Sequence, residues 1–103
     1  MTKTETFKAI TEQMASVYAT KNHDYGNSFA KLRKQYPIAI LIRLSDKLNR
    51  LDTLMTGAKA RVEESIDDTL LDLANYAVME LVERRIERDG KIVPNGQEEG
   101  SRS

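Results

Sequence analysis

Three acidic side chains recur every four residues in a stretch of the sequence that otherwise has the pattern of a buried helix. They are Glu64, Asp68 and Asp72. Residues four apart lie on the same face of an α-helix, so one helix would stack the three carboxylates. Carboxylates are costly to bury unless a cation compensates them. The stripe therefore predicts either a divalent metal ion or the basic side chains of a neighbouring helix beside it.

A metal site is the first interpretation of this acidic stripe. Adjacent carboxylates would lie about 6 Å apart along the helix axis, and Mg²⁺ accepts such oxygen ligands directly or through water. Asp46, from the preceding helix, is a further candidate ligand. Mg²⁺ or Mn²⁺ held there would neutralise a triphosphate and activate water for attack on phosphorus, with Glu64 and Asp68 as candidate catalytic residues. The alternative is a solvated acidic face that pairs with arginine and lysine.

Basic side chains form a second group. Arg43, Lys47 and Arg50 follow one strip of the expected second main helix, and guanidinium groups bind phosphate through paired hydrogen bonds. These cations would bind the phosphates of a nucleotide, or they would pair with the acidic stripe and hold the helices together. The two interpretations are compatible, because an ion pair can open when a phosphate arrives.

A polar segment, residues 21–28, adds further candidate binding residues. Breaks between helices carry function more often than helix interiors do. Lys21 would contact phosphate and Tyr25 would stack on a base, whereas Asp24 would either shape the pocket or cap the following turn. Asn75 shares the face of the acidic stripe and would hydrogen-bond to a base edge or a ribose.

Hydrophobic periodicity predicts three main helices that position these residues. The expected ranges are residues 4–20, 37–55 and from 60–63 to 88, with a short helix over residues 29–36. Thr4 and Pro37 are expected at the starts of the first two, and Gly57 and Gly90 at the ends of the last two. Because no segment has the pattern of a strand, the expected fold class is all-α, a small helical bundle.

The apolar sides of these helices predict how they pack. On the first helix they are Phe7, Ile10, Met14, Val17 and Tyr18, and on the second Ile40, Leu41, Leu44, Leu48, Leu51 and Met55. The third helix has two such sides, one with Ile66, Leu70, Leu73, Ala74, Ala77 and Leu81 and the other with Leu71, Val78 and Met79. A helix that is apolar on two sides is buried on two sides. We therefore expect a second subunit, most simply in a symmetric homodimer.

The composition narrows the class of protein. The chain has 103 residues, and 16 Lys and Arg balance 16 Asp and Glu, which weighs against a general DNA-coating protein. It has no cysteine, which excludes disulfides, thiolate metal sites and thiol nucleophiles. The longest apolar run, residues 38–42, is too short to span a bilayer, and no signal peptide is visible. One domain over residues 1–90, a loose tail over residues 91–103 and a cytoplasmic location (the host cytoplasm if a phage encodes it) are expected.

Three sequence blocks carry a resemblance to a known family. They are KNHDYG at residues 21–26, RLSDKLNRL at 43–51 and ESIDDTLLDLANYA at 64–77. In this order they resemble the nucleotide modification associated domain family of phages and bacteria, over about residues 5–85. The resemblance implies an all-helical protein that is associated with nucleotide-modification genes.

A more distant similarity is to the all-α nucleoside triphosphate pyrophosphatases, the MazG-like enzymes and the dimeric dUTPases. Those enzymes place acids from two helices around Mg²⁺ and cleave a nucleotide to its monophosphate and pyrophosphate, typically as dimers or tetramers. Their ExxD motif is matched by Glu64 and Asp67, or loosely by Glu64 and Asp68. Their EExxE motif is absent from the first helix, which offers only Glu5 and Glu12.

Three functions are compatible with these patterns. The leading hypothesis is a Mg²⁺-dependent (deoxy)nucleoside triphosphate pyrophosphohydrolase, in which the acids hold metal and the basic residues hold phosphates. The second is a non-catalytic protein that sequesters a nucleotide or a nucleotide-derived signal for a phage, with the acids only orienting the cations. The third is an interaction module whose stripes are ion pairs between helices.

Overall fold

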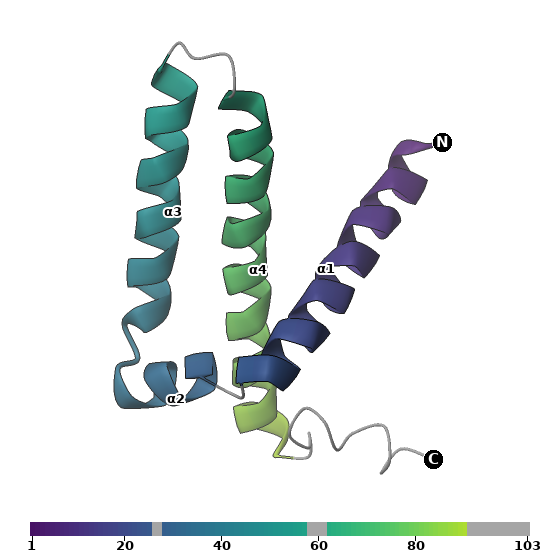
Figure 1. The fold of residues 1–103 in the computed structure, drawn as a ribbon. Coiled ribbons are helices and arrows are strands. Elements are labelled where there is room, and N and C mark those ends of the chain that lie inside the picture. Colours follow the sequence, from purple (N-terminus) through teal and green to yellow (C-terminus); the bar gives the residue numbers. More distant parts are fainter. Residues whose placement is uncertain (26–27, 58–61, 91–103) are drawn as a thin grey trace.

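Four helices make up the part of the chain that the structure, a computed structural model, describes (Figure 1). This part is residues 1–25, 28–57 and 62–90, and for residues 22–25 and 62–64 only the backbone is described. The helices are α1 (Lys3–Tyr25), α2 (Ser28–Gln35), α3 (Ala39–Thr56) and α4 (Val62–Asp89). The all-α prediction is confirmed, and none of these four helices is long and apolar enough to cross a membrane.

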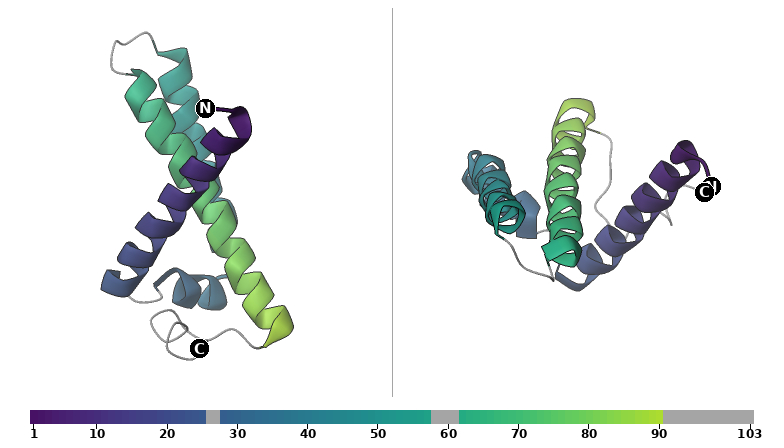
Figure 2. Two further views of the ribbon diagram at one scale, coloured as in Figure 1. Left: turned by 90° about the vertical axis from the view of Figure 1, so that its right-hand side faces the viewer. Right: turned by 90° about the horizontal axis from the view of Figure 1, so that it is seen from above.

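The helices form an open arrangement in which α3 and α4 run side by side in opposite directions (Figure 1). The short helix α2 lies across the end of this pair where α3 begins and α4 finishes. Helix α1 crosses α4 at a steep angle, and its start lies well away from α4 (Figures 1 and 2). The α3–α4 pair is therefore the body of the fold, and α1 lies obliquely against it.

A reciprocal cap begins α1. The backbone N–H of Glu5 donates to the hydroxyl of Thr2 at 3.0 Å, and the N–H of Thr2 donates to the Glu5 carboxylate at 2.7 Å. This pair satisfies two backbone donors that the helix start would otherwise leave free. The prediction that Thr4 caps the helix is therefore wrong, because the pair that can form this box lies two residues earlier.

The far end of α1 also differs from the prediction. The helix continues to Tyr25, so most of the predicted polar break at residues 21–28 is helical. Residues 21–24 include no glycine or proline, and polar side chains alone do not interrupt a backbone that can keep its hydrogen bonds. Lys21 consequently belongs to a helix face and not to a loop.

Pro37 stands in a turn before α3, and the prediction that it opens the helix is wrong by two residues. The N–H of Ala39 donates to the carbonyl oxygen of Tyr36 at 2.9 Å, and Ile38 has φ −77° and ψ −4°. These are the features of a type I turn with proline in its second position. The turn redirects the chain from α2 into α3.

Glycines end α3 and α4, as predicted. The N–H of Gly57 donates to the carbonyl oxygen of Thr53 at 3.0 Å, and that of Gly90 to Ile86 at 2.8 Å. Gly90 has φ +62°, the left-handed conformation that a side chain disfavours at a helix end. The predicted bounds of the last helix are confirmed to within the scatter of helix ends.

The buried core is small within the described residues. Phe29 of α2 and Ala39 of α3 are buried, as is Thr69 of α4, whose hydroxyl donates to the backbone carbonyl of Ser65 at 2.8 Å. The rings of Phe29 and Tyr76 lie 5.9 Å apart at an angle of 56°, a favourable tilted contact. This contact packs α2 onto α4.

Much of the predicted apolar surface is not covered within one chain. Phe7 and Ile10 of α1 are exposed, because the start of this helix leans away from the others (Figure 1). Val17, further along α1, is 43% exposed. On α3 and α4 the exposed large apolar residues are Leu41, Ile42, Leu48, Met55, Leu70, Val78 and Leu81.

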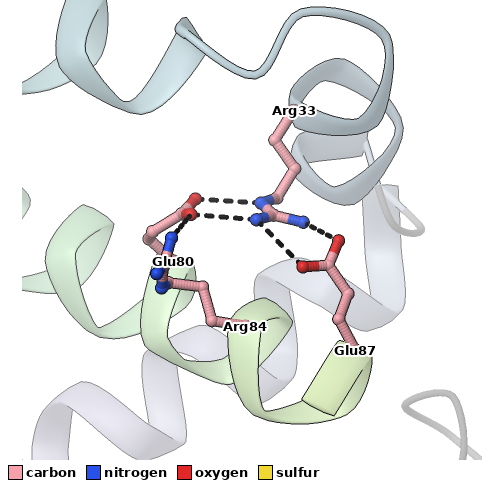
Figure 3. Close-up of polar contacts among 4 residues, drawn as sticks. All are labelled: Arg33, Glu80, Arg84 and Glu87. Atoms are coloured by element: carbon pink, nitrogen blue, oxygen red, sulfur yellow. Dashed lines mark hydrogen bonds and ion pairs between the residues drawn. The ribbon is translucent and has the colours of Figure 1, made fainter. Parts of the chain in front are cut away.

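An arginine that the sequence analysis did not single out joins α2 to α4 (Figure 3). The Arg33 Nε and Nη2 atoms each donate to a different Glu80 carboxylate oxygen at 2.9 Å, and Nη1 donates to Glu87 at 2.6 Å. The side chains of Arg33 and Glu80 are only 11% and 14% exposed. Arg84 adds a longer contact to Glu80 at 3.9 Å. This paired geometry is the strongest form of arginine–carboxylate bond, and it fixes α2 against α4.

Electrostatics within this cluster follow from the same contacts. Hydrogen bonds to Glu80 and Glu87 raise the pKa of Arg33, and the bond from Arg33 lowers the pKa of Glu87. Burial raises the pKa of Glu83, which lies on the same side of α4. The acids at positions 80, 83 and 87 recur at helical spacing, which is the signal in the sequence that could have indicated a basic partner.

Candidate functional site

Two adjoining cavities lie between the helices. The larger, about 530 Å³, is lined by residues from all four helices, and the smaller, about 350 Å³, lies between α1 and α4. Lys21, Asp72 and Asn75 line both. The two cavities therefore share a polar wall, and each has a volume typical of small-molecule sites.

Three cations line the larger cavity. Lys21 comes from α1, and Arg43 and Lys47 come from α3, where their spacing of four residues places them on one face. Asp72 is the one carboxylate among the described lining residues. The lining is therefore basic in a protein whose net charge is zero.

One of these cations is paired. The Lys47 Nζ atom lies 3.3 Å from a carboxylate oxygen of Asp72, and this carboxylate is 54% exposed. No ion pair joins Lys21 or Arg43 to another described residue. The predicted pairing of the basic strip with the acidic stripe is thus found for Lys47, and the remaining cations keep their charge available to a ligand.

Aromatic and apolar side chains make up much of the remaining wall. They are Tyr18, Phe29, Leu32, Tyr76 and Met79. Phe29 and Leu32 project from one side of α2, and Arg33 fixes that helix to α4 through Glu80. The amide of Asn75 donates to the sulfur of Met79 at 3.5 Å, a weak contact that a polar ligand group can replace. The wall therefore offers flat apolar contacts next to the cations.

Two acids of the predicted stripe reach the smaller cavity. Asp68 and Asp72 are one helical turn apart on α4, and Gln13, Met14 and Val17 of α1 lie opposite. Among the residues with described side chains, no three histidine or acidic groups are placed to hold one metal ion. The structure therefore brings two carboxylates together at a cavity, on the helix face that the spacing predicted.

The other predicted site residues lie elsewhere. Asp46 and Arg50 are exposed on α3 and line neither cavity. Asp24 and Tyr25 are in the last turn of α1 and Glu64 is in the first turn of α4, and their side chains lie outside the described residues.

Sequence reasoning missed the part that α2 plays in the site. Phe29 and Leu32 are three residues apart, a spacing that indicates one apolar helix side, but nothing local shows that this side meets a cavity. Tyr76 packs on Phe29 and also lines the larger cavity.

Comparison with known proteins gives one match. The family model described as nucleotide modification associated domain 1 matches residues 21–83, a segment that includes α2, α3, most of α4 and nearly all residues of the larger cavity. No curated protein and no solved structure matches the chain significantly. The match confirms the resemblance seen in the three sequence blocks and associates the protein with nucleotide modification. Since the matched segment covers more than half of the sequence, the chain belongs to the nucleotide modification associated domain 1 family.

Proposed function

We propose that the larger cavity binds a nucleotide and that Lys21, Arg43 and Lys47 hold its phosphates. The observation that carries this proposal is the meeting of three cations from two helices at one cavity. Two of them form no ion pair with a described residue. Family membership, which associates the chain with nucleotide modification, supports the same ligand class.

Lys47 exchanges its partner when a phosphate binds. Its present partner, Asp72, is 54% exposed, so the carboxylate remains hydrated when the lysine turns to phosphate, and no buried charge is left alone. An exposed ion pair contributes little to stability. The exchange therefore costs little, and Lys47 strengthens the charge that attracts the phosphates.

The aromatic wall suits the base. Tyr76 and Phe29 present rings beside the cations, and stacking on an aromatic side chain contributes about 1–3 kcal/mol per base. Asn75 lies on the wall that the two cavities share and carries both a donor and an acceptor for a base edge or a sugar hydroxyl.

Calorimetric titration with nucleoside mono-, di- and triphosphates tests this proposal. Arg43→Gln should weaken triphosphate binding about 10-fold or more, because a hydrogen bond to a charged group contributes about 1.5–3 kcal/mol. Arg50→Gln is the matched control, since it removes the same charge from the same helix outside both cavities. Equal losses in the two variants, or no binding of any phosphorylated nucleoside, would contradict the proposal.

A Mg²⁺-dependent nucleoside triphosphate pyrophosphohydrolase is the second candidate, and Asp68 and Asp72 favour it. One or two carboxylates together with substrate phosphates are a common coordination set for Mg²⁺, so the two residues present fit this ion. Bound there, Mg²⁺ would neutralise phosphate charge and favour attack on phosphorus by water. Lys21 borders both cavities and would orient the phosphates, while Asp68 would accept the proton of the attacking water as the bond to pyrophosphate breaks.

Pyrophosphate release in the presence of Mg²⁺ or Mn²⁺ distinguishes the two candidates. Asp68→Asn should abolish turnover, whereas Asp67→Asn should retain it, because Asp67 is exposed and lines neither cavity. Turnover that is lost only in Asp67→Asn would overturn this assignment. Tight binding without any release of pyrophosphate would leave the sequestering protein as the function.

A further inference from the structure

The α3–α4 pair carries an apolar face that no other described helix covers. Its exposed members are Leu41, Leu48 and Met55 on α3 and Leu70 and Leu81 on α4, each between 46% and 65% exposed. The α3 members are seven residues apart. On α4, Ala74 and Ala77 lie between the leucines and are half-buried, so the positions follow the 4–3–4 spacing of a helix that packs against another.

These residues lie on the side of the pair away from the larger cavity. Successive residues of an α-helix point about 100° apart around its axis. On α3, the half-buried Leu44 therefore points in a direction between that of the cavity residue Lys47 and that of the exposed strip Leu41, Leu48 and Met55. On α4, the half-buried Leu73 lies in the same way between the cavity residue Asp72 and the exposed strip. Because the two helices are antiparallel (Figure 1), these arrangements place both strips on one face, opposite the cavity.

The register of the pair makes this face continuous. The ion pair between Lys47 and Asp72 shows which residues of the two antiparallel helices lie at the same height along the helix axes. Leu48 is then level with the turn that contains Leu70, and Leu41 with the turn between Ala77 and Leu81. Large side chains therefore alternate with alanines across the face, which suits interdigitation with a second helical layer.

The face has the length that a stable interface needs. A standard interface buries roughly 800 Å² on each partner, which is about a tenth of the 8318 Å² that this chain exposes. The strip from Leu41 to Met55 is about 21 Å long at 1.5 Å per residue, and the strip on α4 runs beside it, so the face can contribute an area of this order.

We propose that the apolar face binds the same face of a second copy, so that two α3–α4 pairs form a four-helix core. A self-complementary face under a two-fold axis closes into a dimer, and the heptad spacing of Leu41, Leu48 and Met55 suits helix packing of this kind. Two copies also approach without net repulsion, because the chain has zero net charge. In this dimer the two larger cavities face outward, so dimerisation and nucleotide binding can fail independently.

Sedimentation velocity across a dilution series tests the dimer. The wild-type chain should sediment at twice 11.7 kDa, and Leu48→Glu should raise the dimer dissociation constant by about 100-fold or more, because each dimer would bury two unpaired charges. Ile42→Glu is the matched control, because the two residues are about equally exposed, Ile42 at 51% and Leu48 at 54%. Ile42, however, lies on the side of α3 away from the proposed interface. Ile42→Glu should leave the dimer intact.

A second measurement holds even if Leu48→Glu does not fold. The chain has no cysteine, so Leu48→Cys and Ile42→Cys each provide a single position for a spin label. Because packed helices lie about 8–10 Å apart, labels at position 48 should be closer across the dimer than labels at position 42. Each of three results would overturn the proposal. The wild-type chain could stay monomeric throughout the dilution series, Ile42→Glu could dissociate the dimer while Leu48→Glu does not, or the labels at position 42 could be closer together than those at position 48.

Discussion

Replacing Arg33 by alanine should destabilise the protein more than the same replacement of any exposed arginine. The substitution removes the two hydrogen bonds that Glu80 accepts at 2.9 Å each and leaves this carboxylate, only 14% exposed, without its main partner. Removing one partner of a fully buried ion pair costs about 3–5 kcal/mol. Since Glu87 is 58% exposed and water replaces its share of the contact, we expect about 2–3 kcal/mol in total.

This loss is large enough to measure by thermal unfolding. For a domain of about 100 residues each 1 kcal/mol shifts Tm by about 4–8 °C, so Arg33→Ala should lower Tm by about 10–20 °C in a melt followed by circular dichroism. Arg85→Ala is the control, because Arg85 is exposed and makes no ion pair with a described residue. It should change the free energy of unfolding by less than about 0.5 kcal/mol.

Two further variants identify the cause of the loss. Arg33→Lys keeps the charge but cannot form the paired bonds, so it should recover only part of the stability. In a double-mutant cycle with Glu80→Gln, the two changes should be non-additive, because they remove the same interaction. A melt of Arg33→Ala within about 3 °C of the wild-type protein, or an equal loss in Arg85→Ala, would refute the reasoning.

The same substitution should weaken nucleotide binding. Arg33 does not line either cavity, but it fixes α2, which contributes Phe29 and Leu32 to the larger one. We expect the loss of affinity in Arg33→Ala to be smaller than that in Arg43→Gln, because no phosphate contact is removed.

Two more predictions concern single residues. Burial raises the pKa of Glu83, so the folded state disfavours its ionised form at neutral pH; Glu83→Gln should raise Tm at pH 7, and this gain should disappear below about pH 4, where the carboxyl is protonated in both states. A lower Tm at pH 7 would contradict the prediction. Thr2→Ala should cost about 1 kcal/mol of helix stability at the start of α1, measured as faster amide exchange in its first turn, whereas Thr4→Ala should leave this exchange nearly unchanged. Faster exchange in Thr4→Ala, with no change in Thr2→Ala, would show that Thr4 caps the helix as the sequence predicted and would contradict the prediction for Thr2.

Short-range patterns in the sequence were sufficient to predict the secondary structure of the second half of the chain. The periodicity of α3 and α4 and the glycines at positions 57 and 90 act within a few residues of each other, so neighbouring residues contain the information. The family resemblance is also local, since it depends on three short blocks in a given order. The start of α3 was misjudged because a proline suits both the first turn of a helix and a β-turn, and the sequence does not distinguish them.

The candidate site depended on contacts between segments far apart in the chain. Arg43 and Arg50 have nearly the same direction on α3 and lie about 10 Å apart along its axis, yet only Arg43 lines a cavity. It lies near the start of α3, beside α2 (Figure 1), where residues of α1 and α2 complete the lining. Arg33 and Glu80 meet across 47 residues, which no local pattern encodes. Sequence alone determined that the chain forms amphipathic helices bearing acidic and basic strips. Which of those charges face one another was decided only by the packing of the helices, because the angle and level at which they meet depend on side chains from all of them at once.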